Sequence, residues 1–389
     1  MTIEKPHFQL EVEALRGFCA MGVLYCHMIM YSEKLIPGFH LYGYIPSGLL
    51  LVLVFFSLSG FVIGLSNNES LSVRSYLTKR IVRLYPIYFI VLTFSLTMED
   101  PLRFKVLGNY LFLQNAFCDV PLSNDPLWSL NYEVIYYLLF LGVFFVKKYA
   151  GIIAIFCFTV CVLFSTVLPA LFLAYLVGFV FWMTGFWVST LKFQSVEDKK
   201  CLAVMALLLA AGHLNILQVG FKQINIVDVL PKDQAVGVLN LPLLFYCFIA
   251  LVICTGRLSK YHKLFLIMGY IFVISDFIYC LIYNLPYSSF AFLFCLVSII
   301  MLFFPLIPFA INILSEIGSI SYAVYIIHMP VMIILAKVPF GLGEGLLEFF
   351  IKSIIFLIIV FVLSYFLERK WHPWAKKYFL PKKRIAPSL

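Results

Sequence analysis

The stretch LRGFCAMGVLYCHM, Leu15 to Met28, is apolar along almost its whole length but carries Arg16 near one end and His27 near the other. It lies within an apolar run over residues 12–31, which is long enough to cross a bilayer as one helix. An ionisable side chain in hydrocarbon costs about 2.5–3.5 kcal/mol by insertion scales, so both residues are expected to face protein or a water-filled cavity. The stretch therefore predicts a membrane helix in which two ionisable side chains face protein or a cavity and are candidates for function.

Similar runs recur along the chain of 389 residues, of which 63% are hydrophobic and 12% are charged. This composition excludes a soluble globular domain and predicts an all-α, polytopic transmembrane helix bundle. The predicted spans cover residues 12–31, 46–66, 84–98, 127–146, 150–168, 170–190, 201–218, 238–255, 264–283, 288–310, 319–338 and 346–368. These are twelve spans, but residues 84–98 are few for a span, and Leu168-Pro169 could either break one helix or join two. The prediction is therefore about 10–12 spans.

The distribution of basic residues predicts the orientation of the chain. Short cytoplasmic loops carry an excess of Lys and Arg, and with the N-terminus inside, most basic residues here lie in loops or the tail on that side. We therefore expect both termini in the cytoplasm, a membrane-embedded domain over 1–370 and a basic tail over 371–389. The net charge of +9 suits anionic lipid headgroups and does not imply nucleic acid. The first span lacks signal-peptide features and is expected to be retained.

The ten cysteines lie mostly inside predicted spans and show no CxxC or Cys/His ligand spacing. Disulfides and structural zinc are therefore not expected. We predict no metal and no permanently bound cofactor.

Ionisable side chains within the predicted spans are the first candidates for function. Arg16 and His27 are eleven residues apart, so they share one helix face, about 16 Å apart along the axis. Glu133 is expected at a depth similar to that of His27, where its carboxylate would orient the imidazole and strengthen it as a base. A His27 that only hydrogen-bonds between helices is an equally weighted alternative. The full set is Arg16, His27, Glu133, His213, Asp276, His328, Lys337 and Lys352, of which the last two could snorkel.

A basic cluster precedes Pro86 in SYLTKRIVRLYPIY, and this proline is expected to bend or start the helix that follows. Arg80 and Arg83 are three residues apart and share a helical face. Two guanidinium groups on one face suit phosphate. Anchoring to lipid phosphate is the alternative, and the general rule for cytoplasmic loops alone favours it.

Five motifs in order carry a resemblance to a known family. They are the Arg16–His27 pair, FFSLSGFVI (Phe55–Ile63), RIVRLYPIY (Arg80–Tyr88), WSLNYEVIYYLL (Trp128–Leu139) and SISYAVYIIHMP (Ser319–Pro330). Together they resemble the acyltransferase-3 family of bacterial membrane proteins, whose members move acyl groups, usually acetyl, onto sugars of cell-surface polysaccharides and related acceptors.

The resemblance implies an acyl-CoA-dependent O-acyltransferase of the bacterial inner membrane, with acyl-CoA as co-substrate and a polysaccharide or lipid-linked sugar as acceptor. His27 would be the catalytic base and Glu133 its partner in the active site. Acyl-CoA would be bound with the help of Arg16, Arg80 and Arg83. Possible substrate or oxyanion contacts are Trp128, Ser129, Tyr322 and His328.

Two mechanisms and two other classes of protein stay open. His27 could activate the acceptor hydroxyl directly, or it could carry the acyl group itself. Intramembrane His, Asp and Glu also fit a polytopic transporter or flippase of a lipid-linked sugar or small solute. A membrane scaffold or sensor is the third class, but it would have no need of Arg16, His27 and Glu133.

Overall fold

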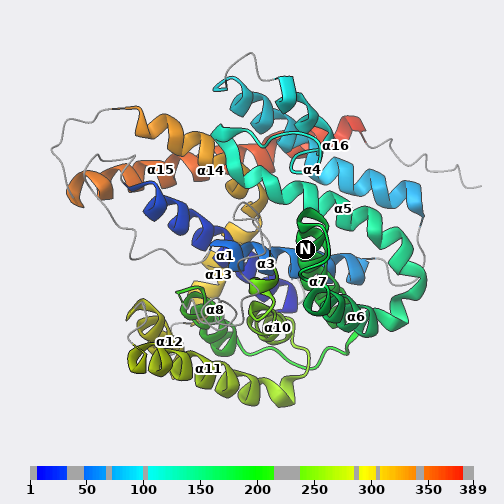
Figure 1. Cartoon of the computed structure of the whole chain (residues 1–389). Helices are drawn as coiled ribbons and strands as arrows, with labels where there is room; N and C mark the ends of the chain where they lie inside the picture. The colour runs from blue at the N-terminus through cyan, green and yellow to red at the C-terminus, as the bar shows by residue number, and fades with distance from the viewer. Residues whose placement is uncertain are drawn as a thin grey trace, which may run out of the picture. The chain divides into compact units, whose positions relative to one another are not determined.

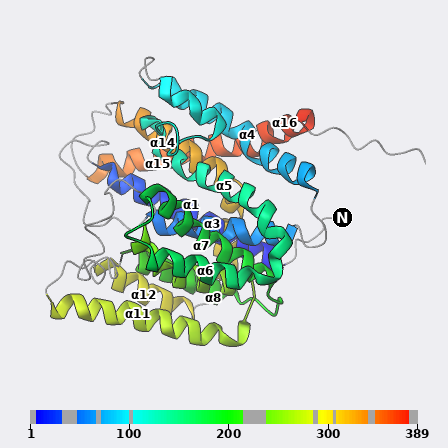
Figure 2. The ribbon, with the colours of Figure 1, turned by 45° about the vertical axis from the view of Figure 1, so that its right-hand side comes forward.

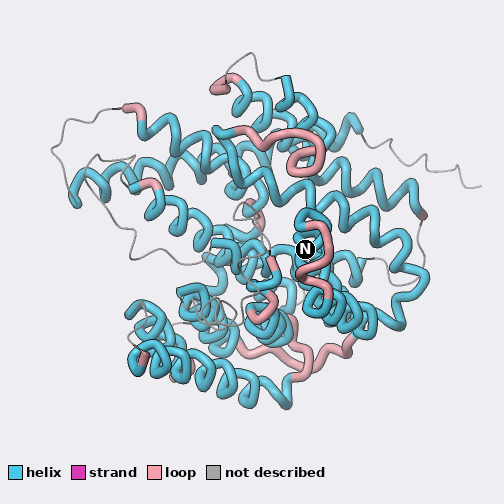
Figure 3. Tube along the Cα trace, viewed as in Figure 1, coloured by secondary structure: helices cyan, strands magenta, loops and turns pink. Residues whose placement is uncertain are grey.

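The computed structural model describes residues 7–32, 48–66, 72–99, 104–213, 237–283, 289–303, 307–338 and 346–379. These residues form helices joined by short loops (Figure 3), and among them the only β-structure is two isolated bridges. The predicted all-α class is thereby confirmed. Residues 214–236, which include the end of the predicted span 201–218, lie outside the described residues, as does the predicted tail from residue 380.

The chain divides into two compact units. Unit 1 contains residues 7–32, 48–66 and the described part of 142–319, and unit 2 contains the described part of 69–141 and 320–379. The helices of unit 1 are α1 (His7–Met30), α3 (Gly48–Ser66), α6 (Ala150–Leu163), α7 (Ala170–Thr190), α8 (Asp198–His213), α10 (Leu243–Cys254), α11 (His262–Ile282), α12 (Ser289–Met301) and α13 (Ile307–Gly318). Short helices η4 (Phe144–Tyr149), η6 (Val238–Asn240) and η7 (Ser259–Tyr261) join them.

Unit 2 is built from four longer helices and several short ones. They are α4 (Val73–Leu96), η2 (Phe104–Leu111), η3 (Leu122–Leu127), α5 (Trp128–Val143), α14 (Ser321–Ala336), α15 (Leu346–Phe366), the π-turn η8 (Leu367–Trp371) and α16 (His372–Phe379). Helix α16 forms the start of the predicted tail. In unit 2, α14 and α15 lie side by side, and in unit 1, α11 pairs with α12 (Figures 1 and 2).

Six described helices are long and apolar enough to cross a membrane, or seven if α13 and α14 form one broken span. Two further apolar helices, Leu243–Cys254 and Phe290–Met301, are shorter. The predicted single span 288–310 is wrong, because it is divided between α12 and α13. Pro308 stands in the first turn of α13, where a residue without an N–H is tolerated. Pro169 likewise precedes α7 and separates it from α6.

Close helix contacts hold unit 1 together through glycine. A Cβ atom on Gly17 of α1 would lie 1.9 Å from the carbonyl oxygen of Leu314 in α13. A Cβ atom on Gly185 of α7 would lie 1.8 Å from the carbonyl oxygen of Ser57 in α3. In apolar bundles small residues let helix backbones approach in this way, and dispersion and polar contacts between the helices replace the hydrophobic effect. These two contacts anchor the helix that carries Arg16 and His27 and the helix that follows it.

Two helices of unit 2 contain an internal proline. Pro86 lacks an N–H, which leaves the carbonyl of Val82 without a donor within α4, and a ring nitrogen of His372 meets that oxygen at 3.0 Å. Pro330 likewise leaves the carbonyl of Ile326 without a donor within α14, and the side-chain amide of Asn124 donates to this oxygen at 2.9 Å. The predicted span 84–98 therefore begins too late. Of the two expectations for Pro86, the start of a helix is wrong, and a bend stays a prediction. Helix α4 runs through the proline, because another segment supplies the missing donor.

Candidate functional site

Arg16 and His27 lie on α1 in unit 1, and both side chains are half-buried. The Arg16 guanidinium meets the carboxylate of Glu13 at 3.3 Å, one turn earlier. A ring nitrogen of His27 hydrogen-bonds to the carbonyl of Val23, also one turn earlier. In a neutral imidazole this bond makes that nitrogen the donor and the other nitrogen the acceptor. Glu13 was not among the predicted site residues, although its spacing from Arg16 is that of a helical ion pair.

The other predicted residues lie in unit 2, on α4, α5 and α14. The predicted pairing of His27 with Glu133 joins residues of different units and stays a prediction.

Arg80 and Arg83 sit on one face of α4 and are held by tyrosine rings. The Arg80 guanidinium carbon lies 5.5 Å from the centre of the Tyr76 ring and 5.7 Å from that of Tyr137. The Arg83 guanidinium carbon lies 5.4 Å from the centre of the Tyr322 ring. Cation–π contacts of this kind hold a guanidinium in place and leave its edge able to bind an anion.

Arg83 also forms an ion pair that the sequence analysis missed. Its Nη1 lies 2.8 Å from Oε2 of Glu368 in η8, and the Glu368 side chain is only 5% exposed. The same face is closed by Tyr322, whose hydroxyl donates to the carbonyl of Leu84 at 3.0 Å. Part of the charge of Arg83 is therefore already balanced within the protein.

Glu133 belongs to this cluster. The hydroxyl of Tyr137, one helical turn along α5, donates a short hydrogen bond to the Glu133 carboxylate. The carboxylate also interacts electrostatically with Tyr76 and Tyr322. Unit 2 thus brings Glu133 together with Arg80 and with the tyrosines that hold both arginines. Tyr76 and Tyr137 stand four residues from Arg80 and Glu133, a helical spacing that could have identified them from the sequence.

Ser129 and His328 are tied to the same tyrosine of α14. The Ser129 hydroxyl lies 2.9 Å from the hydroxyl of Tyr325 and donates to the carbonyl of Pro126 at 3.0 Å. His328 is fully buried, and its Nδ1 lies 2.6 Å from the carbonyl of Tyr325. The Trp128 ring packs edge-on against a neighbouring tyrosine of α5. Tyr325 was not predicted, although it lies within the late motif.

Three of the remaining intramembrane candidates contact neighbouring side chains of their own unit. Lys352 forms an ion pair with Glu348 at 3.0 Å and is buried, so it does not snorkel. His213 stacks between aromatic rings of α12. Asp276 is buried and accepts a weak hydrogen bond from the thiol of Cys280. The contacts named here for His213 and Asp276 include none of the predicted site residues.

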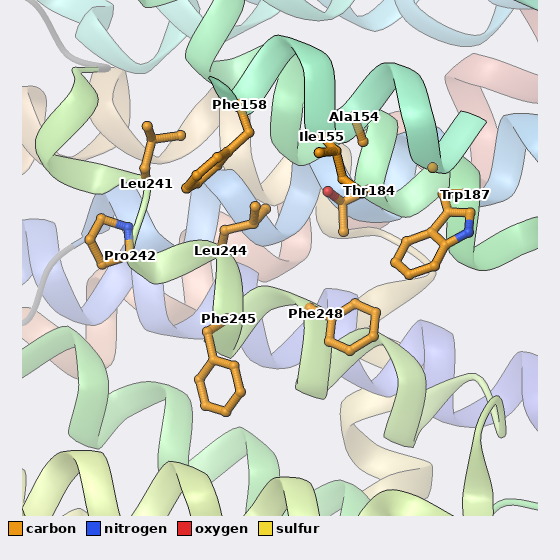
Figure 4. A pocket seen from close by; sticks show the side chains of 11 residues that line it. Ala154, Ile155, Phe158, Thr184, Trp187, Leu241, Pro242, Leu244, Phe245 and Phe248 are labelled. Atoms are coloured by element: carbon orange, nitrogen blue, oxygen red, sulfur yellow. The ribbon is translucent and has the colours of Figure 1, made fainter. Parts of the chain in front are cut away.

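Unit 1 contains an apolar cavity of about 510 Å³ between α6, α7 and α10 (Figure 4). Phe158, Trp187, Phe245 and Phe248 line it, and Thr184 is the only hydroxyl among its lining residues. None of the described residues that line the cavity has an ionisable side chain. It suits an alkyl chain, but it offers no group for chemistry.

In the part of the chain that the structure describes, no group of three or more His, Cys, Asp or Glu side chains could hold a metal ion. All ten cysteines lie in the described part of the chain, and none of them forms a disulfide there.

The fold and these clusters define a polytopic helical protein with an arginine pair and a carboxylate on tyrosine-rich helices. A model of the acyltransferase-3 family, described as an acyltransferase domain, matches residues 9–283. The chain therefore belongs to this family. The match includes four of the five sequence motifs and ends before the fifth, at residues 319–330.

A curated relative supports this assignment over part of the chain. Acyltransferase MdmB of Streptomyces mycarofaciens is 30% identical over 142 residues, which is 32% of this chain. The matched region spans 36% of the length of that relative. No solved structure matches the chain.

Proposed function

We propose that the chain is an integral-membrane O-acyltransferase of the bacterial inner membrane. It moves an acyl group, most simply acetyl, from cytoplasmic acyl-CoA to a hydroxyl of a cell-surface polysaccharide or lipid-linked sugar. Membership of the acyltransferase-3 family and the apolar helices support this class of activity.

One observation carries the proposal. Arg80 and Arg83 come from one sequence motif and Glu133 from another, and in unit 2 they contact the same tyrosines. Tyr137 contacts both Arg80 and Glu133. Tyr322, from a third motif, interacts with both Arg83 and Glu133. Structural anchoring to lipid would not require a carboxylate beside the arginines. A site that handles a phosphorylated donor and a reacting proton has a use for both kinds of group.

In this proposal Arg80 and Arg83 bind phosphate groups of the donor. The predicted topology puts them at the cytoplasmic end of α4, on the side where coenzyme A is made. Both guanidinium groups are proposed to contact the donor, although Glu368 already offsets part of the charge of Arg83. Arg16 assists at the same predicted side of α1.

The chemistry assigned to His27 is general base catalysis. The unprotonated ring nitrogen of His27 takes the proton of the acceptor hydroxyl while the hydroxyl oxygen attacks the thioester carbonyl. The C–S bond then breaks, and the imidazolium returns the proton to the departing thiolate of coenzyme A. Such catalysis contributes about 10²–10⁴-fold. Glu133 is proposed to orient the imidazole, and the Trp128 indole and the Ser129 hydroxyl to donate hydrogen bonds to the developing oxyanion.

The covalent route differs in one intermediate. In that route a ring nitrogen of His27 attacks the thioester first and holds the acyl group until the acceptor arrives. Mixing the purified protein with labelled acetyl-CoA in the absence of acceptor separates the two routes. Label that stays on the wild type and is absent from His27→Ala indicates the covalent route, whereas unlabelled but active protein indicates the direct one.

The test of the function itself compares ester-linked acetate on the surface glycans of cells that carry the wild type or a variant. His27→Ala should abolish the acetate at unchanged protein level, and Arg80→Gln should raise the KM for acetyl-CoA at least tenfold in membranes. Lys79→Gln is the matched control, because Lys79 is exposed and its replacement removes the same charge from the same helix turn. Undiminished acetate in His27→Ala would exclude the proposed base. A transporter or flippase would release no coenzyme A from acetyl-CoA.

A further inference from the structure

The turn between α10 and α11 in unit 1 holds an arginine that the proposed function does not use. Arg257 lies between two residues with left-handed backbone, Gly256 with φ of 65° and Leu258 with φ of 51°. A non-glycine residue in this region is strained, and such residues cluster at functional sites. The strained turn carries the buried side chain of Arg257.

Hydrogen bonds hold this backbone in place. The Arg257 N–H donates to the carbonyl of Val252 at 2.9 Å, and the Gln194 N–H donates to the carbonyl of Gly256 at 2.8 Å. The side-chain carbonyl of Gln194 accepts from the N–H of Ser259 at 2.6 Å. The position of Arg257 is therefore specified by the segment after α7 as well as by its own turn.

The guanidinium of Arg257 is buried, and it has no counter-ion among the residues that the structure describes. The residue is 6% exposed, and its guanidinium carbon lies 5.8 Å from the ring centres of both Phe61 and Phe193. Nε is enclosed and has no hydrogen-bond partner. Across the described residues, no carboxylate lies within ion-pair distance of this side chain. Burial lowers the pKa of Arg257 below its usual value, and no acid offsets this effect.

The described groups around Arg257 supply no net negative charge. His262 is 1% exposed, its Nε2 lies 2.6 Å from the carbonyl of Arg257, and it interacts electrostatically with Lys200. Lys200 is also buried, but Glu197 pairs with it at 2.5 Å. Glu197 is thus already engaged by Lys200, and among the described residues no acid balances the charge of Arg257. Removing a charge from water without a partner costs several kcal/mol, a cost that an anionic ligand would offset.

We propose that Arg257 is the centre of a second anion site, in unit 1, which binds the phosphate group of a phosphate ester. The two phenylalanine faces hold the guanidinium plane, and because Nε is the enclosed nitrogen, the edge with Nη1 and Nη2 is the one that meets the ligand. This edge matches two phosphate oxygens. The predicted topology puts the turn on the cytoplasmic side, where a soluble phosphate ester or a lipid headgroup can supply the phosphate. The proposal does not depend on the acyltransferase chemistry.

The experiment measures how two probes shift the Tm of the full-length protein in detergent. Coenzyme A is the soluble probe. Phosphatidylglycerol is the lipid probe, and its effect is compared with that of phosphatidylcholine. Arg257→Gln should weaken the apparent affinity for the effective probe about 10- to 100-fold, the range expected for losing one charge-assisted contact. Arg257→Lys, which keeps the charge but loses the planar fork, should weaken it less. Lys260→Gln, an exposed cation of the same turn, is the matched control and should behave as the wild type.

Each variant is also prepared in an Arg80→Gln chain, so that binding of coenzyme A at the proposed donor site does not hide the effect. Loss of the coenzyme A shift identifies a soluble phosphate ester, and loss of the phosphatidylglycerol shift identifies a headgroup. A purely structural Arg257 would lower the Tm without altering either shift, and this result would overturn the proposal. A wild type that responds to neither probe would overturn it as well. If Arg257→Gln does not fold, Arg257→Lys provides the same comparison.

Discussion

The ion pair between Arg83 and Glu368 allows a structural role of Arg83 to be separated from a role in binding the donor. The Glu368 side chain is 5% exposed and that of Arg83 is 31% exposed. Arg83→Gln would leave a buried carboxylate whose Oε1 already lacks a hydrogen-bond partner. Breaking a fully buried pair in this way costs about 3–5 kcal/mol. Because Arg83 is partly exposed, we expect a loss of about 2–3 kcal/mol in the free energy of unfolding.

The double variant Arg83→Gln/Glu368→Gln removes the stranded charge and should recover most of this stability. It should not recover affinity for acyl-CoA, because the guanidinium that is proposed to bind phosphate is still missing. Glu368→Gln alone should cost less stability than Arg83→Gln and leave the affinity for acyl-CoA unchanged or higher. Thermal unfolding in detergent and calorimetric titration with coenzyme A, made on the same samples, measure both quantities.

Two results would refute this reasoning. A double variant as unstable as Arg83→Gln would mean that the buried carboxylate is not the source of the loss. A double variant with wild-type affinity for coenzyme A would mean that Arg83 does not contact the donor phosphates.

Three further predictions concern the fold. Asn124→Ala removes the donor to a carbonyl that Pro330 leaves unpaired, and it should lower the free energy of unfolding by about 1–3 kcal/mol in a denaturant titration. Gly185→Ala should reduce the yield of folded protein sharply, because its Cβ would meet a backbone oxygen, whereas Gly142→Ala, with open space around its Cβ, should not. The hydrogen bond from Lys200 lowers the pKa of Glu197 from 4.5, so the pair stabilises the protein above about pH 4.5 and this contribution is lost as the pH falls further. The Tm difference between wild type and Lys200→Met should therefore shrink on acidification, and a constant difference would exclude the pair as its source.

Hydrophobic runs were sufficient to predict the all-α class and most helices, because a helix in lipid satisfies its own backbone and needs only a long apolar sequence. The same approach misplaced the start of α4 and merged α12 with α13. In α4 the helix continues through Pro86, and a ring nitrogen of His372 meets the carbonyl of Val82 that the proline leaves without a donor. A rule that reads proline as a helix boundary considers only neighbours in sequence.

The sequence by itself determined the helical class, the family motifs and the common face of Arg80 and Arg83 on one helix, since each depends on composition or on short-range spacing. The tertiary structure alone decided that Glu368 balances Arg83 and that Asn124 completes a helix more than two hundred residues away. It alone decided that Arg257 is buried with no acid within ion-pair distance in the described part of the chain. Local periodicity specifies which face of a helix a side chain occupies. The partner that meets this face depends on how distant helices pack, and no local pattern encodes that.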